Sequence, residues 1–182
     1  MVSTKTLIPR LLNFALFQAG WFAGVLLAAR GRPLAALAAA VAAIGVNLWL
    51  FSSDRPGDLR LVLAAALIGF CLDTLHLHLG VFALVGAPRF SRLCPFWLAA
   101  LWGLLGTALR GSLSWLAGRY WLSAALGAVG GPMSYLGGAK LGAASLPANR
   151  AFGIAALAVG WAVAMPLLVW LAHGRGRESV HG

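Results

Sequence analysis

Residues 151–172 read AFGIAALAVGWAVAMPLLVWLA, an uninterrupted run of 22 residues without a single charge. An α-helix needs about 20 mainly apolar residues to cross the roughly 30 Å hydrocarbon core of a bilayer. The run is too long for an ordinary buried strand and long enough for a full crossing. It therefore predicts a membrane-spanning helix.

The same kind of apolar run recurs along the rest of the chain. We expect five further helices, over residues 11–29, 34–51, 59–78, 93–109 and 113–130. Gly, Pro and charged residues separate the runs, as in the turn-forming sequence SSDRPGD at residues 52–58. The fold class predicted is all-α, an integral membrane bundle of about six transmembrane helices.

The composition supports this class and limits what else the chain can contain. Of the 182 residues, 61% are hydrophobic and 10% are charged, against about 45–50% and about 25% in soluble domains. Six crossings use about 120 residues, so no room remains for a separate soluble catalytic domain. We expect one multi-pass transmembrane domain over residues 1–172 and a polar, flexible tail over residues 173–182.

The net charge of +10 does not indicate a nucleic-acid partner. The 14 Lys and Arg residues are scattered in small groups between the apolar runs, whereas a nucleic-acid binder concentrates them on one face. The predicted partners are membrane lipids and other membrane proteins. The predicted location is the bacterial inner (cytoplasmic) membrane, and the distribution of Lys and Arg slightly favours both termini in the cytoplasm.

Two segments do not fit the simple pattern of crossings. Residues 80–87 are apolar but too short to cross, so they either continue the third helix or form a re-entrant piece. Residues 131–148 are rich in small residues and are not expected to be an independent span. They are interpreted as a candidate re-entrant segment, whose notable residues are Gly131, Pro132, Ser134, Tyr135 and Lys140. A Ser–Lys mechanism is open there, but a lysine reaching for the head groups is the favoured reading.

The strongest candidate for a polar site is the cluster near the end of the third helix. Asp73 and His76 are three residues apart and share one helix face, whereas His78 lies about 200° around from His76. Ionisable groups inside a span are costly unless they are paired, hydrated or functional. Too few further ligands are present for a metal site, so neither a metal nor a cofactor is predicted.

Three uncharged polar residues, Asn13, Gln18 and Asn47, fall within the first two predicted helices. Buried amides in membrane bundles usually find partners on neighbouring helices. They are interpreted either as contacts that hold helices together or as the wall of a cavity that they share with Asp73.

Pairs of glycines four residues apart let helices approach closely. Three such pairs predict packing surfaces: Gly20 with Gly24, Gly127 with Gly131, and Gly138 with Gly142.

Two groups of residues resemble a known family. They are Asn13-Phe14, Phe17-Gln18 and Trp21-Phe22 with Asp73, and the segment Gly131-Pro132-x-Ser134-Tyr135-x-x-Gly138-x-x-Leu141-Gly142-Ala143. The chain is similar, over about residues 11–172, to an uncharacterised family of short bacterial inner-membrane proteins, domain of unknown function number 2878. The resemblance implies a multi-pass membrane setting, and it supplies no activity, cofactor or catalytic residue.

The sequence favours an accessory protein or small enzyme of membrane-lipid metabolism, because so little of the chain lies outside the bilayer. No catalytic residue can be assigned. Two alternatives stay open: a small ion-coupled transporter that uses Asp73 and a gate at residues 131–148, and a structural subunit of a membrane complex.

The six runs predict a testable topology. Reporter fusions at Asp58, Ser112 and Gly182 should report one side of the membrane, and fusions at Arg32, Arg89 and Pro147 the other. If fusions at Asp58 and Arg89 reported the same side, the third crossing would be wrong.

Overall fold

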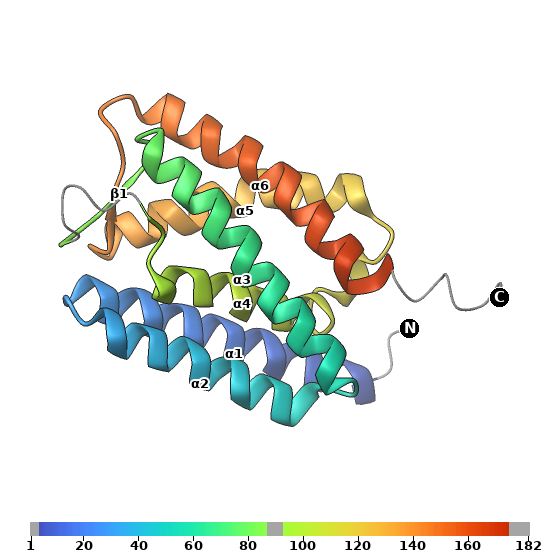
Figure 1. The fold of residues 1–182 in the computed structure, drawn as a ribbon. Helices are drawn as coiled ribbons and strands as arrows, with labels where there is room; N and C mark the ends of the chain where they lie inside the picture. The colour runs from blue at the N-terminus through green and yellow to red at the C-terminus, as the bar shows by residue number, and fades with distance from the viewer. Residues whose placement is uncertain (1–3, 87–92, 175–182) are drawn as a thin grey trace.

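The computed structural model describes residues 4–86 and 93–174. Within them the chain forms six α-helices (Figure 1): α1 Thr4–Ala29, α2 Pro33–Phe51, α3 Arg55–His78, α4 Phe96–Leu109, α5 Tyr120–Lys140 and α6 Arg150–His173. A 3-10 turn, η1, covers Ser114–Leu116 between α4 and α5. The all-α prediction is confirmed.

Local sequence explains where several helices begin. Pro33 opens α2, where a missing backbone N–H costs least. Asp54 caps α3 by accepting a hydrogen bond from the Gly57 backbone N–H at 3.1 Å, and Asn149 caps α6 by accepting from the Phe152 N–H. Such caps satisfy donors that have no partner inside the helix.

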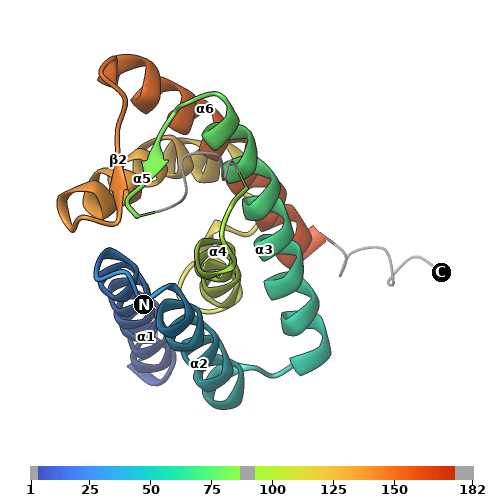
Figure 2. The ribbon, with the colours of Figure 1, turned by 60° about the vertical axis from the view of Figure 1, so that its left-hand side comes forward.

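Four of the described helices are long and apolar enough to cross a bilayer: α1 from Leu7 onward, α2, α3 and α6. The 14-residue α4 spans only about 21 Å. Its place is the middle of the bundle, where most of its residues are buried by α1, α2, α3 and α6 (Figure 2).

The exterior of the bundle is apolar, unlike that of a water-soluble protein. Leu63 and Leu67 on α3 and Val159 and Val163 on α6 are each more than 60% exposed. The interior is also mainly apolar, but among the described residues it buries five polar side chains: Asn13, Asn47, Asp73, His76 and Ser123. An apolar exterior of this kind is solvated by lipid, and the chain is therefore an integral membrane bundle.

Two of the three predicted glycine pairs lie at helix contacts. A Cβ at Gly20 would meet Ala43 of α2 and Leu104 of α4, and one at Gly24 would meet Leu101 of α4. A Cβ at Gly131 would lie 2.2 Å from the Trp161 ring, and Gly127 similarly faces the backbone of Trp161 on α6.

The third pair, Gly138 with Gly142, does not form a helix contact. A Cβ at Gly138 would meet nothing within 4 Å, and Gly142 has a positive φ of 87° in the turn after α5.

A short antiparallel pair of strands closes one end of the bundle. β1 (Ala83–Leu84) follows α3, and β2 (Ala144–Ser145) follows α5. Ala83 pairs with Ser145 and Leu84 with Ala144. The pair joins the segments after α3 and α5, which are about 60 residues apart in sequence.

The predicted fifth helix and the predicted re-entrant segment need correction. The helix begins at Tyr120 rather than at residue 113, and it continues without a break to Lys140. Residues 131–140 are therefore the second half of α5. Residues 113–119, which the sequence predicts as the start of this helix, instead form a connection that contains η1 and Gly118, with a φ of 74°. Arg119 consequently lies at the N-terminal end of α5 instead of six residues inside it.

Two smaller expectations also change. The α3 helix ends at His78, and Gly80 with a φ of 66° turns the chain toward β1, so residues 80–86 do not continue the helix. His173, assigned to the polar tail, belongs to α6. Ala87, Arg89 and residues 175–182, including the Gly182 fusion site, lie outside the described residues.

The contact between α3 and α4 gives a stability test. A Cβ at Gly69 would lie 1.9 Å from the Trp102 ring, so Gly69→Ala should destabilise the protein by about 1–3 kcal/mol, as overpacking does. The matched Gly45→Ala, where a Cβ meets nothing within 4 Å, should instead be neutral or stabilising. Thermal unfolding in detergent measures both, and equal effects would contradict this packing.

Candidate functional site: a buried carboxylate beside an apolar cavity

Asp73 on α3 is the centre of a buried polar network, with no exposed surface. Its Oδ2 accepts a hydrogen bond from Trp102 Nε1 of α4 at 2.9 Å. Its Oδ1 accepts a hydrogen bond from the Tyr135 hydroxyl of α5. Both carboxylate oxygens thus have a donor, and the network joins three helices.

His76 lies one helical turn from Asp73 and is also buried, at 3% exposure. Its Nδ1 is 3.7 Å from Asp73 Oδ1, which is beyond hydrogen-bond distance. Among the described residues, Nδ1 has no hydrogen-bond partner. Gly160 of α6 makes room for the ring, because a Cβ there would lie 2.9 Å from it.

Asn13 and Asn47 belong to a different network. Asn13 Nδ2 donates to Asn47 Oδ1 at 2.8 Å and to the Thr107 carbonyl at 3.3 Å, and Asn13 Oδ1 accepts from the Ser112 backbone N–H. Both amides line a cavity of about 80 Å³ that shares no lining residue with the larger cavity described below. They hold α1, α2 and α4 together, whereas the half-buried Gln18 lines neither cavity.

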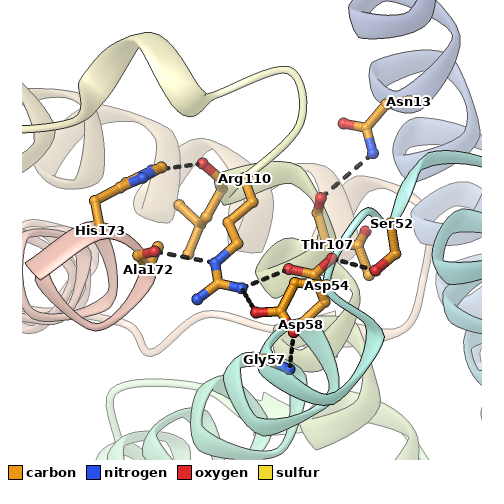
Figure 3. Close-up of polar contacts among 10 residues, drawn as sticks. Asn13, Ser52, Asp54, Gly57, Asp58, Thr107, Arg110, Ala172 and His173 are labelled. Atoms are coloured by element: carbon orange, nitrogen blue, oxygen red, sulfur yellow. Dashed lines mark hydrogen bonds and ion pairs between the residues drawn. The ribbon is translucent and has the colours of Figure 1, made fainter. Parts of the chain in front are cut away.

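Close to these amides, Arg110 ties three helix ends together (Figure 3). Its Nη1 lies 2.9 Å from Asp58 Oδ1 and 3.3 Å from Asp54 Oδ2, at the start of α3. Its Nε donates to the Ala172 carbonyl near the end of α6, at 3.0 Å. The sequence does not predict this cluster, because Arg110 and the two acids are more than 50 residues apart and no periodicity connects them.

The residues predicted as notable in the second half of α5 lie in different surroundings from one another. Tyr135 is buried in the Asp73 network, and Gly131 and Pro132 are buried beside it. Ser134 is half-buried, and Lys140 is exposed in the last turn of the helix. Ser134 and Lys140 occur six residues apart on one helix, which places them on different faces.

A cavity of about 270 Å³ lies beside the Asp73 network. Its walls come from α1, α4, α5, α6 and the two short strands. Four glycines of α5, at positions 127, 130, 131 and 138, line it, and a Cβ at Gly130 or Gly138 would meet nothing within 4 Å. Tyr135 and Trp102 belong both to the wall and to the network.

Aromatic rings form much of the cavity wall. Trp102 and Trp161 stack with their ring centroids 4.1 Å apart and an interplanar angle of 24°. Phe82 contacts Tyr135 with a centroid separation of 4.8 Å. Gly69 and Gly131 make this stack possible, because each leaves space for one of the two indole rings.

The cavity reaches the surface between α1 and α5. Leu126 and Gly130 of α5 are exposed and also line it. Trp21 of α1 lies close to α5: a Cβ added at Gly137 would be 3.2 Å from its ring. Both of the exposed lining residues, Leu126 and Gly130, are uncharged and apolar.

The fold and this buried network define the class of protein: a helical integral membrane protein with an intramembrane cavity. The chain matches the family model "Protein of unknown function (DUF2878)" over residues 10–167. It therefore belongs to this family, as the resemblance in its sequence predicted. No curated protein and no solved structure matches the chain.

The network predicts different effects for two substitutions at Asp73. Asp73→Ala leaves the Trp102 and Tyr135 donors without an acceptor, and each such loss costs about 1–3 kcal/mol. Asp73→Asn should destabilise much less, because the amide oxygen can accept from Trp102 while Tyr135 accepts from the amide nitrogen.

Thermal unfolding in detergent compares the two variants. Equal loss of stability would mean that the negative charge itself, and not the pattern of hydrogen bonds, holds the three helices.

Proposed function

We propose that this protein acts in membrane-lipid metabolism, as a small enzyme or an accessory protein, and that it binds a lipophilic molecule in the cavity beside Asp73. The observation that carries the proposal is the apolar cavity that opens between α1 and α5 next to a buried carboxylate. Membrane lipids are the partners that reach such an opening.

The path of entry supports a lipophilic ligand. The surface around Leu126 and Gly130 belongs to the apolar exterior of the bundle. A molecule dissolved in the bilayer reaches the cavity there without crossing a polar region, whereas a water-soluble molecule would first have to leave water.

The polar network supplies the chemistry that a small enzyme needs. Tyr135 lines the cavity, and its hydroxyl is hydrogen-bonded to Asp73, with His76 one turn behind. A hydroxyl coupled to a carboxylate can pass a proton to or from a bound molecule, which is the role of a general acid or base. An accessory protein would use the same groups to orient its ligand.

The transporter alternative loses one of its arguments. Discontinuous helices mark the sites of many transporters, but residues 131–140 of the proposed gate at 131–148 lie in a continuous helix. The structural-subunit alternative does not require the cavity. The cavity-filling variants described below therefore test it as well.

We further propose an inner-membrane location with both termini in the cytoplasm. The Asn13 and Arg110 contacts indicate that the starts of α1 and α3 lie at the same end of the bundle as the ends of α2, α4 and α6. The start of α5 lies at this end too (Figure 1). Among the described residues, six Lys and Arg occur at this end and four at the other. Positive residues favour the cytoplasmic side.

Cavity filling tests the proposed function in a deletion strain. Gly138→Leu places a side chain where a Cβ meets nothing within 4 Å, at a buried position that lines the cavity. It should fold and fail to restore the lipid profile of the parent strain. The control Gly45→Leu makes the same change on the exposed side of α2, and it should complement fully. Full complementation by Gly138→Leu would contradict a role for the cavity.

Asp73→Asn tests the polar network in the same assay. It should remain inserted and folded but lose activity, because asparagine accepts no proton near neutral pH. His76→Gln should give a similar loss if the two residues act together. If Asp73→Asn restores the lipid profile, the network serves packing alone.

A further inference from the structure

We infer that the cavity takes an uncharged, ring-headed lipid that carries carbonyl acceptors, the chemical class of the quinones. The inference rests on the proposed function and names the ligand class of the same site. Three properties of the cavity wall carry it: its lack of charge, its stacked aromatic rings and its free hydrogen-bond donor.

The first property is the lack of charge. None of the described residues that line the cavity carries a charge. Asp73 does not line it, because Trp102 and Tyr135 lie between the carboxylate and the cavity and occupy both of its oxygens. A buried phosphate or carboxylate would find no cation to pair with, and an unpaired charge in an apolar site is very costly. The buried part of the ligand is therefore neutral.

The second property is the shape of the wall. Seven of the lining residues are aromatic and come from five different parts of the fold: Phe17, Trp21, Phe82, Trp97, Trp102, Tyr135 and Trp161. Trp102 and Trp161 stack on each other, and an aromatic wall of this kind favours edge-to-face or offset contact with another flat ring. A saturated acyl chain gains nothing specific from such stacking.

The size of the cavity agrees with a ring and part of a tail. An apolar cavity of about 150 Å³ binds a benzene molecule, and this one has about 270 Å³. A substituted ring with several methylenes fits, but a complete two-chain lipid does not. The rest of an apolar tail can leave through the opening at Leu126 and Gly130.

The third property is the donor. Trp161 lines the cavity, and its buried Nε1 lies near the Tyr135 hydroxyl but makes no hydrogen bond of normal geometry among the described residues. A buried donor without a partner is costly, so an acceptor on the ligand would be favoured. The hydroxyl of Ser134 adds a second possible donor in the wall. A carbonyl on a neutral ring meets both requirements.

Ligand binding tests the inference with the purified full-length protein in nanodiscs. The probe is a decyl-substituted benzoquinone, and the measurements are tryptophan quenching and the rise in Tm that binding produces. The wild type and Gly45→Leu should bind it saturably with equal affinity. Gly138→Leu should bind it at least about tenfold more weakly.

Removing the donor gives a second, independent readout. Trp161→Phe should weaken binding about fivefold, which corresponds to the loss of one hydrogen bond. Trp170→Phe, an exposed tryptophan on the same helix, should leave the affinity unchanged. Equal affinity of all three proteins would overturn the role of Trp161 and with it the inferred carbonyl acceptor.

A linear probe, dodecan-1-ol, separates failure of the inference from failure of the proposed function. If dodecan-1-ol binds the wild type but not Gly138→Leu, while the benzoquinone does not bind, the ring-headed ligand is wrong and the lipid site stands. If neither probe binds and Gly138→Leu complements the deletion, both proposals are overturned.

Discussion

The burial of one carboxylate inside an apolar bundle is the constraint on which the rest of the structure depends. Asp73 has no exposed surface, and its two oxygens are satisfied by Trp102 of α4 and Tyr135 of α5. Because α5 packs mainly on α6, this network is its direct polar link to α3 and α4. The hydrogen bonds to Asp73 fix the distance between α5 and the centre of the bundle. They therefore also set the width of the cavity.

The two ends of the bundle restrain the same geometry. At one end, Arg110 joins the start of α3 to the end of α6, and the Asn13–Asn47 pair joins α1 to α2. At the other end, β1 and β2 hold together the segments that follow α3 and α5. Between the two ends, Gly130 and Gly138 of α5 leave space in the cavity wall, because a Cβ at either position would meet nothing within 4 Å.

The sequence predicted those helices whose apolar runs end at clear breaks. Residues 34–51 and 151–172 agree closely with α2 and α6, because Pro33 and the cap at Asn149 mark their starts. The start of α5 could not be predicted in this way. Residues 113–118 carry no charge, and the break depends on the backbone conformation of Gly118. The Gly-rich half of α5 is a poor helix by composition, but packing against Trp161 stabilises it.

The candidate site was only partly visible in the sequence. Asp73 and Tyr135 each drew attention, one as a buried acid and the other as part of a supposed re-entrant segment, but they are 62 residues apart and no periodicity connects them. Trp102 gave no signal, because a tryptophan within an apolar run is ordinary. The cavity could not be predicted either, since it depends on the positions of helices that share no sequence pattern. Among the residues that line the cavity, the glycines at 127, 130, 131 and 138 were the feature of the sequence that pointed to it.

The most direct measurement is the identity of the molecules that remain bound when the protein is purified from its native membrane. Mass spectrometry of an organic extract should find an uncharged lipophile in near-stoichiometric amount with the wild type and with Gly45→Leu, and a much smaller amount with Gly138→Leu. The same lipid composition in all three preparations would contradict a lipid-binding cavity beside Asp73.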